Sequence, residues 1–148
     1  MGSYIYTTIY DDPKPDMGWL VGRRIISVEK TDCSWFFVLD DGSSIGTESL
    51  WRLVADNKIV VTSEDHGHPF GLPAPVDAVE RAMKTVGQNP ISRFELRDAT
   101  SDLVLHFAND ASIEFLNLSC GYESWRTVHE QQEVICMGGG KLAEIRGQ

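Results

Sequence analysis

The chain has 148 residues, of which 42% are hydrophobic and 24% charged, the balance of one soluble globular domain that buries its own core. Its 22 acidic and 13 basic residues give a net charge of −9. Proteins neutralise phosphates with lysine and arginine, so the sequence predicts no nucleic-acid partner and no anionic membrane surface. An acidic surface favours basic partners, although acidity also serves solubility alone.

The chain carries three scattered cysteines: Cys33, Cys120 and Cys136. The odd number and the lack of a Cys-x-x-Cys pair indicate neither a disulfide framework nor a zinc ribbon, so reduced thiols in a cytoplasm fit best. Residues 1–16 lack the basic and apolar segments of a secretory signal, and the longest apolar run, Trp35–Leu39, is too short to span a membrane. We therefore expect a cytoplasmic protein with a single domain, residues 1–148.

The first expected elements in chain order are strands. A strand over Tyr4–Tyr10 could precede a proline-rich loop. Residues 21–62 contain runs rich in aromatic and β-branched residues, a composition typical of strands. These runs are Ile25–Glu29, Trp35–Leu39 and Lys58–Thr62. The turn Asp40–Ser43 predicts a hairpin, because its glycine accepts a positive φ.

Residues 75–86 predict one amphipathic helix. Pro75 suits the first helical turn, and Gly87 is a suitable C-terminal stop. Four apolar residues recur at helical spacing: Val76, Val79, Met83 and Val86. We expect this apolar stripe to pack across a sheet face.

Residues 90–137 repeat the order of elements of the first half. Leu39–Ile45 (LDDGSSI) aligns with Phe107–Ile113 (FANDASI), turn on turn. Trp51–Val60 (WRLVADNKIV) aligns with Trp125–Ile135 (WRTVHEQQEVI) after a single insertion. The Trp-Arg pair at matching offsets favours duplication over the chance resemblance of two hairpins.

The whole chain is therefore predicted to be an α+β domain that is β-rich and mostly antiparallel. Two repeated four-stranded β units, at about residues 21–62 and 90–137, are joined by the central helix at about 75–86. By analogy, such a pseudo-two-fold arrangement places a groove where the copies meet. Unpaired edge strands in either copy could also support a homodimer.

The segment EDHGH is the strongest candidate for chemistry. Glu64, Asp65, His66 and His68 place two carboxylates and two imidazoles within five residues. In an extended segment the two histidines point the same way, so both could reach one divalent metal such as zinc. A third ligand would come from the two carboxylates or from a distant residue. A polar loop whose histidines form local hydrogen bonds is the competing interpretation.

Two further patterns fall short of a catalytic signature. Cys120 lies near Ser119 and Ser124, but no base stands at a diagnostic spacing and no Gly-x-Ser-x-Gly elbow occurs. The segment MGGGK at Met137–Lys141 lacks the Gly-x4-Gly-Lys-Ser/Thr frame of a phosphate-binding loop. Its glycines instead predict a strand end or close backbone packing. The sequence therefore predicts no catalytic residue.

The two Trp-Arg units and the glutamates near them form the candidate binding set: Glu48, Trp51, Arg52, Glu123, Trp125 and Arg126. We expect the tryptophans at equivalent places in each half, with each arginine paired to the glutamate of its own half. A repeated packing feature is one interpretation. The other is an exposed binding surface, because tryptophan and arginine are enriched among the hot spots of protein interfaces.

The chain contains GRRIISVEKTDCSWFFVLDDGSSI with WRLV, followed by DLVLHFANDASIEFL, GYESWRTV and a terminal GGG. In these segments it resembles small, largely uncharacterised bacterial proteins. Proteins of that kind are found beside polymorphic or contact-dependent toxins as candidate immunity proteins. The resemblance covers roughly residues 20–140 and rests on structural motifs, so it carries over no catalytic residue. It implies a cytoplasmic role in binding another protein.

These patterns favour a non-enzymatic, acidic protein-binding module, an immunity protein that neutralises a bacterial toxin by masking its basic site. Such a protein would find its basic toxin by electrostatic steering, hold it with aromatic anchors and need no cofactor. The alternative is a metal-dependent, hydrolase-like enzyme whose EDHGH loop binds one divalent metal that activates water. A small-ligand binder that uses the groove between the repeats is neither supported nor excluded.

Overall fold

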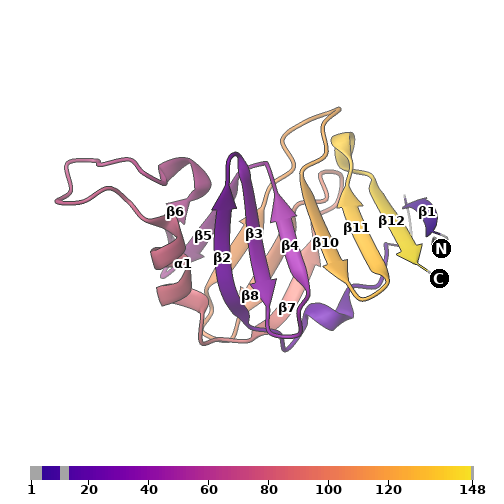
Figure 1. Ribbon diagram of the computed structural model, residues 1–148, viewed down its shortest axis with the longest axis horizontal. Coiled ribbons are helices and arrows are strands. Elements are labelled where there is room, and N and C mark those ends of the chain that lie inside the picture. Colours follow the sequence, from indigo (N-terminus) through magenta and orange to yellow (C-terminus); the bar gives the residue numbers. More distant parts are fainter. Residues whose placement is uncertain (1–4, 11–13, 148) are drawn as a thin grey trace.

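The computed structural model describes residues 5–10 and 14–147, which form mostly strands and one α-helix (Figure 1). The predicted strand over Tyr4–Tyr10 is present from Ile5, and Tyr4 lies outside the described residues. The first half contains the strands β1 Ile5–Tyr10, β2 Ile25–Thr31, β3 Ser34–Leu39, β4 Ser44–Thr47, β5 Trp51–Ala55 and β6 Lys58–Thr62. The second half contains β7 Ile91–Leu96, β8 Leu103–Phe107, β9 Ser112–Phe115, β10 Trp125–His129, β11 Gln132–Cys136 and β12 Leu142–Gly147. The helix is α1, Ala78–Val86, and single 3-10 turns lie at η1 Gly18–Leu20, η2 Ser63–Asp65 and η3 Gly138–Gly140.

The strands form two antiparallel sheets that are layered with a core between them (Figure 1). The seven-stranded sheet has the order β1-β12-β11-β10-β4-β3-β2, and the five-stranded sheet has the order β6-β5-β9-β8-β7. The structure therefore confirms a β-rich, antiparallel α+β architecture, which is built from two sheets.

Each sheet combines strands from both halves of the chain. In the seven-stranded sheet, β4 of the meander β2–β3–β4 pairs with β10 of the hairpin β10–β11. In the five-stranded sheet, β9 of the meander β7–β8–β9 pairs with β5 of the hairpin β5–β6. Residues 21–62 and residues 90–137 thus each contribute three strands to one sheet and two strands to the other, and β12 and β1 extend the seven-stranded sheet.

The two meanders share their local geometry. A bulge interrupts the pairing near the start of both β2 and β7. In the turns that follow, the Gly42 amide donates to the Leu39 carbonyl at 3.0 Å, and the Asp110 amide donates to the Phe107 carbonyl at 2.9 Å. Gly42 and Asp110 have φ angles of 87° and 67°, a region that glycine and aspartate tolerate better than most residues.

Residues 21–62 and 90–137 hold five strands each, so the predicted four-stranded units are wrong in that respect. The sequence predicted no strand at either Trp-Arg pair. In the structure, Trp51–Ala55 and Trp125–His129 are strands with neighbours on both sides. One neighbour of each comes from the other half of the chain. A local pattern carries little information about such distant partners, because strand preference depends on packing context.

Helix α1 closes one end of the sandwich by packing against the edge strands β2 and β6. The predicted packing across a sheet face is therefore wrong, although the side chains of Ala78, Ala82 and Val86 are buried in the core. The helix also begins after Pro75, because Asp77 caps it by accepting from the Glu80 amide at 3.0 Å. No helix in the described parts of the chain reaches the length and hydropathy that a membrane crossing requires.

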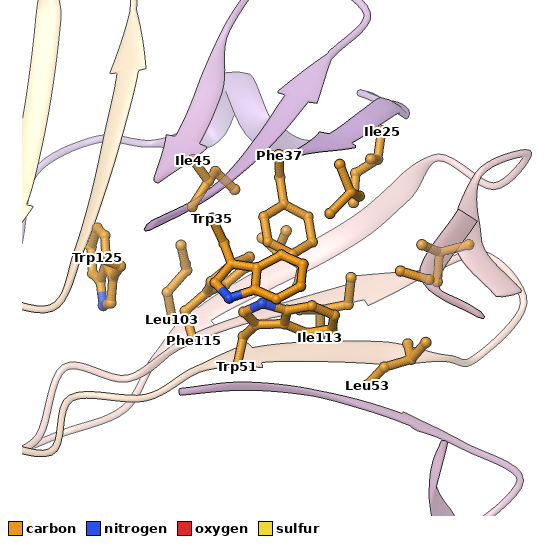
Figure 2. Packing of buried hydrophobic residues seen from close by; sticks show 14 of the residues in the cluster. Ile25, Trp35, Phe37, Ile45, Trp51, Leu53, Leu103, Ile113, Phe115 and Trp125 are labelled. Atoms are coloured by element: carbon orange, nitrogen blue, oxygen red, sulfur yellow. The ribbon is translucent and has the colours of Figure 1, made fainter. Parts of the chain in front are cut away.

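The core is built around an aromatic cluster between the sheets (Figure 2). Alternation along β3 buries Trp35 and Phe37 and leaves Phe36 on the outer face. Trp51 meets both buried rings edge-on, with centroids 5.2 Å from Trp35 and 5.1 Å from Phe37. Phe115 meets Phe37 in the same way at 5.0 Å. Edge-to-face pairs of this kind add about 0.5–1.5 kcal/mol each to the area that they bury.

Candidate binding site on the seven-stranded sheet

The EDHGH segment starts in η2 and continues into the loop from β6 to α1, which projects beyond the end of the sandwich (Figure 1). Asp65 caps η2 because its carboxylate accepts from the Thr62 amide at 2.9 Å. Glu64 is exposed, and its amide donates to Thr62 Oγ1 at 3.2 Å. The two carboxylates therefore serve local turn geometry and solvent.

The two histidines of this segment take separate partners. His66 Nδ1 accepts from the Ala78 amide at 3.0 Å, whereas the His68 ring stacks on exposed Phe70 with centroids 5.5 Å apart. Gly67 between them has a φ of 83°, so the segment turns where an extended strand was expected. Among the described residues, no group of three or more His, Cys, Asp or Glu side chains could hold a metal ion. The geometry gives the metal alternative no support.

Trp51 and Arg52 lie away from any shared binding surface. Trp51 is fully buried in the aromatic cluster. Arg52 was expected beside Glu48, but its Nε donates to Glu114 Oε2 at 2.6 Å and its second nitrogen reaches Oε1 at 3.3 Å. The reason is register: Arg52 on β5 lies directly opposite Glu114 on β9, a strand of the other half.

Glu114 is the centre of an ion-pair network on the outer face of the five-stranded sheet. Its side chain is only 7% exposed and also contacts Arg97, which reaches Asp102 at 3.4 Å. Burial alone raises the pKa of the Glu114 carboxyl, but the hydrogen bonds and charges of Arg52 and Arg97 outweigh it and hold that pKa below its ordinary value. The hydrogen bonds to Glu114 likewise raise the pKa of both guanidinium groups.

Trp125 is also buried, and its Nε1 donates to the Ser101 carbonyl at 2.9 Å. The residue after it faces outward: Arg126 pairs with Glu123 at 3.3 Å, as expected, and with Glu133 at 2.8 Å. Of the predicted binding set, the structure brings together Glu48, Glu123, Trp125 and Arg126 around one hollow. Trp51 and Arg52 are not part of it.

This hollow, named here the Gly46 hollow, has a volume of about 330 Å³ on the outer face of β3, β4 and β10. It is lined by Ser34, Phe36, Gly46, Thr47, Glu48, Glu123, Ser124, Trp125 and Arg126. Phe36 and Arg126 lie on either side of Gly46 in register. A Cβ atom at Gly46 would lie 3.2 Å from Phe36 Cε1, so the missing side chain lets the Phe36 ring lie against β4 at the edge of the hollow.

A second hollow of about 610 Å³, named here the Tyr122 hollow, adjoins the first. The two share Glu48, Glu123 and Ser124, and the second adds Leu118 and Tyr122 from the loop between β9 and β10. Leu118 is 67% exposed and Tyr122 is 83% exposed. Because both side chains line the same hollow, they form one exposed apolar patch, a feature that can mark an interaction surface.

The loop that carries Tyr122 is held in place by backbone contacts. The Ser119 hydroxyl accepts from the amides of Gly121 and Tyr122 at 3.0 and 2.9 Å. Gly138 packs so tightly on Gly121 that a Cβ there would lie 2.4 Å from the Gly121 backbone. The glycines of the MGGGK segment therefore allow close packing, as the sequence predicted, and they fix the rim of the Tyr122 hollow.

Asp41, Ser43 and His129 form a cluster that the sequence did not reveal. Ser43 Oγ lies 2.6 Å from His129 Nδ1, and Asp41 Oδ2 lies 3.4 Å from the same nitrogen. A catalytic triad needs the hydroxyl and the carboxylate on opposite ring nitrogens, so this arrangement does not activate the buried Ser43. These two contacts of His129 hold the β3–β4 turn against β10, and the His129 ring also stacks on Trp19 of η1 with centroids 4.3 Å apart.

Cys136 is the buried cysteine of the core. Burial raises the pKa of the Cys136 thiol to about 11, which keeps it protonated and unreactive near neutral pH. Cys33 and Cys120 are exposed.

The residues of this surface that sequence reasoning missed include Phe36, Gly46, Leu118 and Tyr122. Because side chains alternate along β3, Phe36 lies on the face away from the buried Trp35 and Phe37. This alternation could have identified Phe36 as a candidate from the sequence. No local pattern shows that β10 lies beside β4, and that pairing creates the Gly46 hollow.

Comparisons of the chain with protein-family models, with curated proteins and with solved structures give no match in any of the three sets. No relative therefore assigns a role to a residue of the two hollows. The resemblance to toxin-associated immunity proteins stays a prediction from the sequence, and function rests on the geometry of the site.

Proposed function

We propose that the chain is a non-enzymatic protein-binding module that neutralises a basic bacterial toxin by covering the toxin's functional site. The observation that carries this proposal is the continuous surface over the Gly46 and Tyr122 hollows. It combines exposed Phe36, Leu118 and Tyr122 with the carboxylates of Glu48 and Glu123. Aromatic anchors beside charged groups are typical of the central residues of protein interfaces.

Electrostatics support a basic partner. The chain carries a net charge of −9, which attracts a basic protein over a distance and speeds the encounter. The hydrogen bonds of Ser119 Oγ with the amides of Gly121 and Tyr122 hold the backbone of this loop, which lowers the entropy that binding would cost. The proposal places the protein in the cytoplasm, where the exposed thiols of Cys33 and Cys120 stay reduced.

We also propose that residues 21–62 and 90–137 are copies of one unit that exchanged their last hairpins. Support comes from the matching bulges in β2 and β7, the matching turns before β4 and β9, and the reciprocal pairings of β4 with β10 and of β9 with β5. Trp125 and Trp51 lie opposite the last residues of these partner strands, Thr47 and Phe115.

Affinity capture with a functional readout tests the proposed function. The tagged chain is purified from its own host at low salt, about 0.01 M, and at high salt, about 1 M. Over this range the Debye length falls from roughly 30 to 3 Å, so electrostatic attraction between the proteins is screened. We expect one basic protein at low salt and less of it at high salt. That protein should harm cells when expressed alone and become harmless when the chain is co-expressed.

The double variant Leu118→Ser/Tyr122→Ser should lose both capture and protection. Both side chains are largely exposed, so the variant should fold normally. Phe70→Ser is the matched control, because Phe70 is 63% exposed on the distant β6–α1 loop. Equal capture by the double variant, or a captured protein that harms no cell, contradicts the proposal.

A further inference from the structure

Two rows of side chains, one on the outer face of each sheet, match position by position. In the five-stranded sheet the row runs through Val104, Glu114 and Arg52 on β8, β9 and β5. In the seven-stranded sheet it runs through Phe36, Gly46 and Arg126 on β3, β4 and β10. Gly46 thus stands where the other sheet has the Glu114 carboxylate. The Gly46 hollow occupies the corresponding space.

The charges around the two rows differ. The five-stranded row is balanced, because Arg52 and Arg97 face Glu114 and Asp102. Beside Gly46, one guanidinium faces three carboxylates: Arg126 against Glu48, Glu123 and Glu133. Arg126 lies closest to Glu133, at 2.8 Å, which leaves two carboxylates at the hollow without full compensation.

Glu48 is the least compensated of these groups. It is exposed, and its Oε1 accepts from Ser34 Oγ at 3.1 Å. Within residues 14–147 it forms no ion pair. Glu123 is 52% exposed, and among the described residues its ion pair is with Arg126 at 3.3 Å. An incoming cation therefore gains charge interactions that no described residue provides.

We infer that the Gly46 hollow receives an arginine side chain of the basic protein partner, an inference that rests on the proposed function. The guanidinium pairs with Glu48 and Glu123 and packs against the ring of Phe36. The partner's guanidinium thus corresponds to that of Arg97, the second guanidinium that contacts Glu114 in the five-stranded sheet.

The shape and charge of the hollow select this ligand. An anion is repelled by the excess of carboxylates, and Arg126 is already engaged by glutamates. Lysine fits less well, because a planar guanidinium can bridge two carboxylates while it stacks on an aromatic ring. Gly46 contributes by leaving room for the ring of Phe36, because a Cβ atom there would lie 3.2 Å from Phe36 Cε1.

The test is a titration of the isolated protein with N-acetyl-arginine amide, followed through the backbone amide signals in NMR spectra. A single side chain should bind with a dissociation constant of about 1–10 mM. We expect saturable shifts at Gly46, Glu48 and Glu123. N-acetyl-citrulline amide, which has the same shape without the charge, should leave these signals in place, and N-acetyl-lysine amide should bind more weakly.

Two variants test the contacts separately. The double variant Glu48→Gln/Glu123→Gln should raise the dissociation constant at least about tenfold, equivalent to about 1.4 kcal/mol. Gly46→Ala should weaken the binding, because a Cβ atom there would lie 3.2 Å from Phe36 Cε1 and displace the ring on which the guanidinium packs. Asp56→Asn is the control, because it removes one exposed charge in the β5–β6 turn, where the positive φ of 53° suits asparagine.

The outcomes separate this inference from the proposed function. Absence of saturable shifts around Gly46 up to about 50 mM, well above the expected dissociation constant, overturns the arginine site even if a toxin is captured. An equal loss of affinity in Asp56→Asn also overturns it, because the effect is then one of net charge. Arginine binding without any captured basic protein contradicts the proposed function and leaves the arginine site in place.

Discussion

The outer faces of the two sheets carry an arginine at the same place in the strand order and use it differently. Arg52 closes over Glu114, whose side chain is 7% exposed, and Arg97 completes the pair. Arg126 is 48% exposed beside a glycine and meets glutamates that are 52% and 28% exposed. A charge network that is balanced and closed holds strands together, whereas one that is unbalanced and open is available to a partner.

Solvation explains why the two networks should differ in energy. Glu114 lost most of its water when β9 paired with β5, so its stability depends on both guanidinium groups. The groups around Gly46 kept their water, and exposed ion pairs contribute only about 0–1 kcal/mol. The first network should therefore matter for folding and the second for binding.

The largest expected difference comes from removing one carboxylate from each network. Glu114→Gln should lower the free energy of unfolding by about 2 kcal/mol, less than the roughly 3–5 kcal/mol of a fully buried pair, because both arginines are over a third exposed. Glu123→Gln should change it by less than about 0.5 kcal/mol. Urea unfolding of the two variants measures both, and equal losses would contradict the comparison.

Removing the arginines should give a smaller difference in the same direction. Arg52→Gln should lower the free energy of unfolding by about 1 kcal/mol, because Glu114 keeps Arg97 as a partner. Arg126→Gln should cost less than about 0.5 kcal/mol, because its glutamates return to water. Thermal unfolding at matched pH and salt checks the order. A larger loss in Arg126→Gln would show that the open network also supports the fold.

The smallest expected effect is a difference in acid sensitivity. The folded-state pKa of Glu114 is held below its unfolded value, so its contribution is fully present above the unfolded pKa of about 4.3 and is lost as pH falls through the folded pKa. The free energy of unfolding of wild type should therefore decline more steeply below about pH 4.5 than that of Glu114→Gln. Asp41 and Glu95, whose pKa values are also lowered, titrate alike in both proteins and cancel. Parallel acid profiles would contradict the role given to Glu114.

Much of the secondary structure could be predicted because it depends on neighbouring residues. Alternation of apolar side chains places Trp35 and Phe37 on one face of β3, and the glycine of Asp40–Ser43 permits the turn that follows. The stop at Gly87 ends α1 where the sequence placed it. The repeated order of residues 21–62 and 90–137 was likewise visible in the sequence, although duplication itself stays a prediction.

The candidate site was only half visible from the sequence. Glu48, Glu123, Trp125 and Arg126 do lie around one hollow, but the Trp-Arg pattern drew attention to both arginines alike. The two arginines differ in their contacts because Arg52 lies opposite a glutamate of β9, whereas Arg126 lies opposite a glycine of β4. The histidines of EDHGH seemed paired only because an extended backbone was assumed across Gly67, whose φ is positive.

The sequence by itself determined the local elements, the faces of the strands and the acidic charge of the surface. Only the tertiary structure decided that each sheet combines both halves, and hence which arginine meets a carboxylate and where a hollow opens. The physical reason is that a side-chain period of two sets the face of a strand but not its neighbour. The neighbour is chosen by burial of the shared core around Trp51 and Phe37, a property of the whole chain.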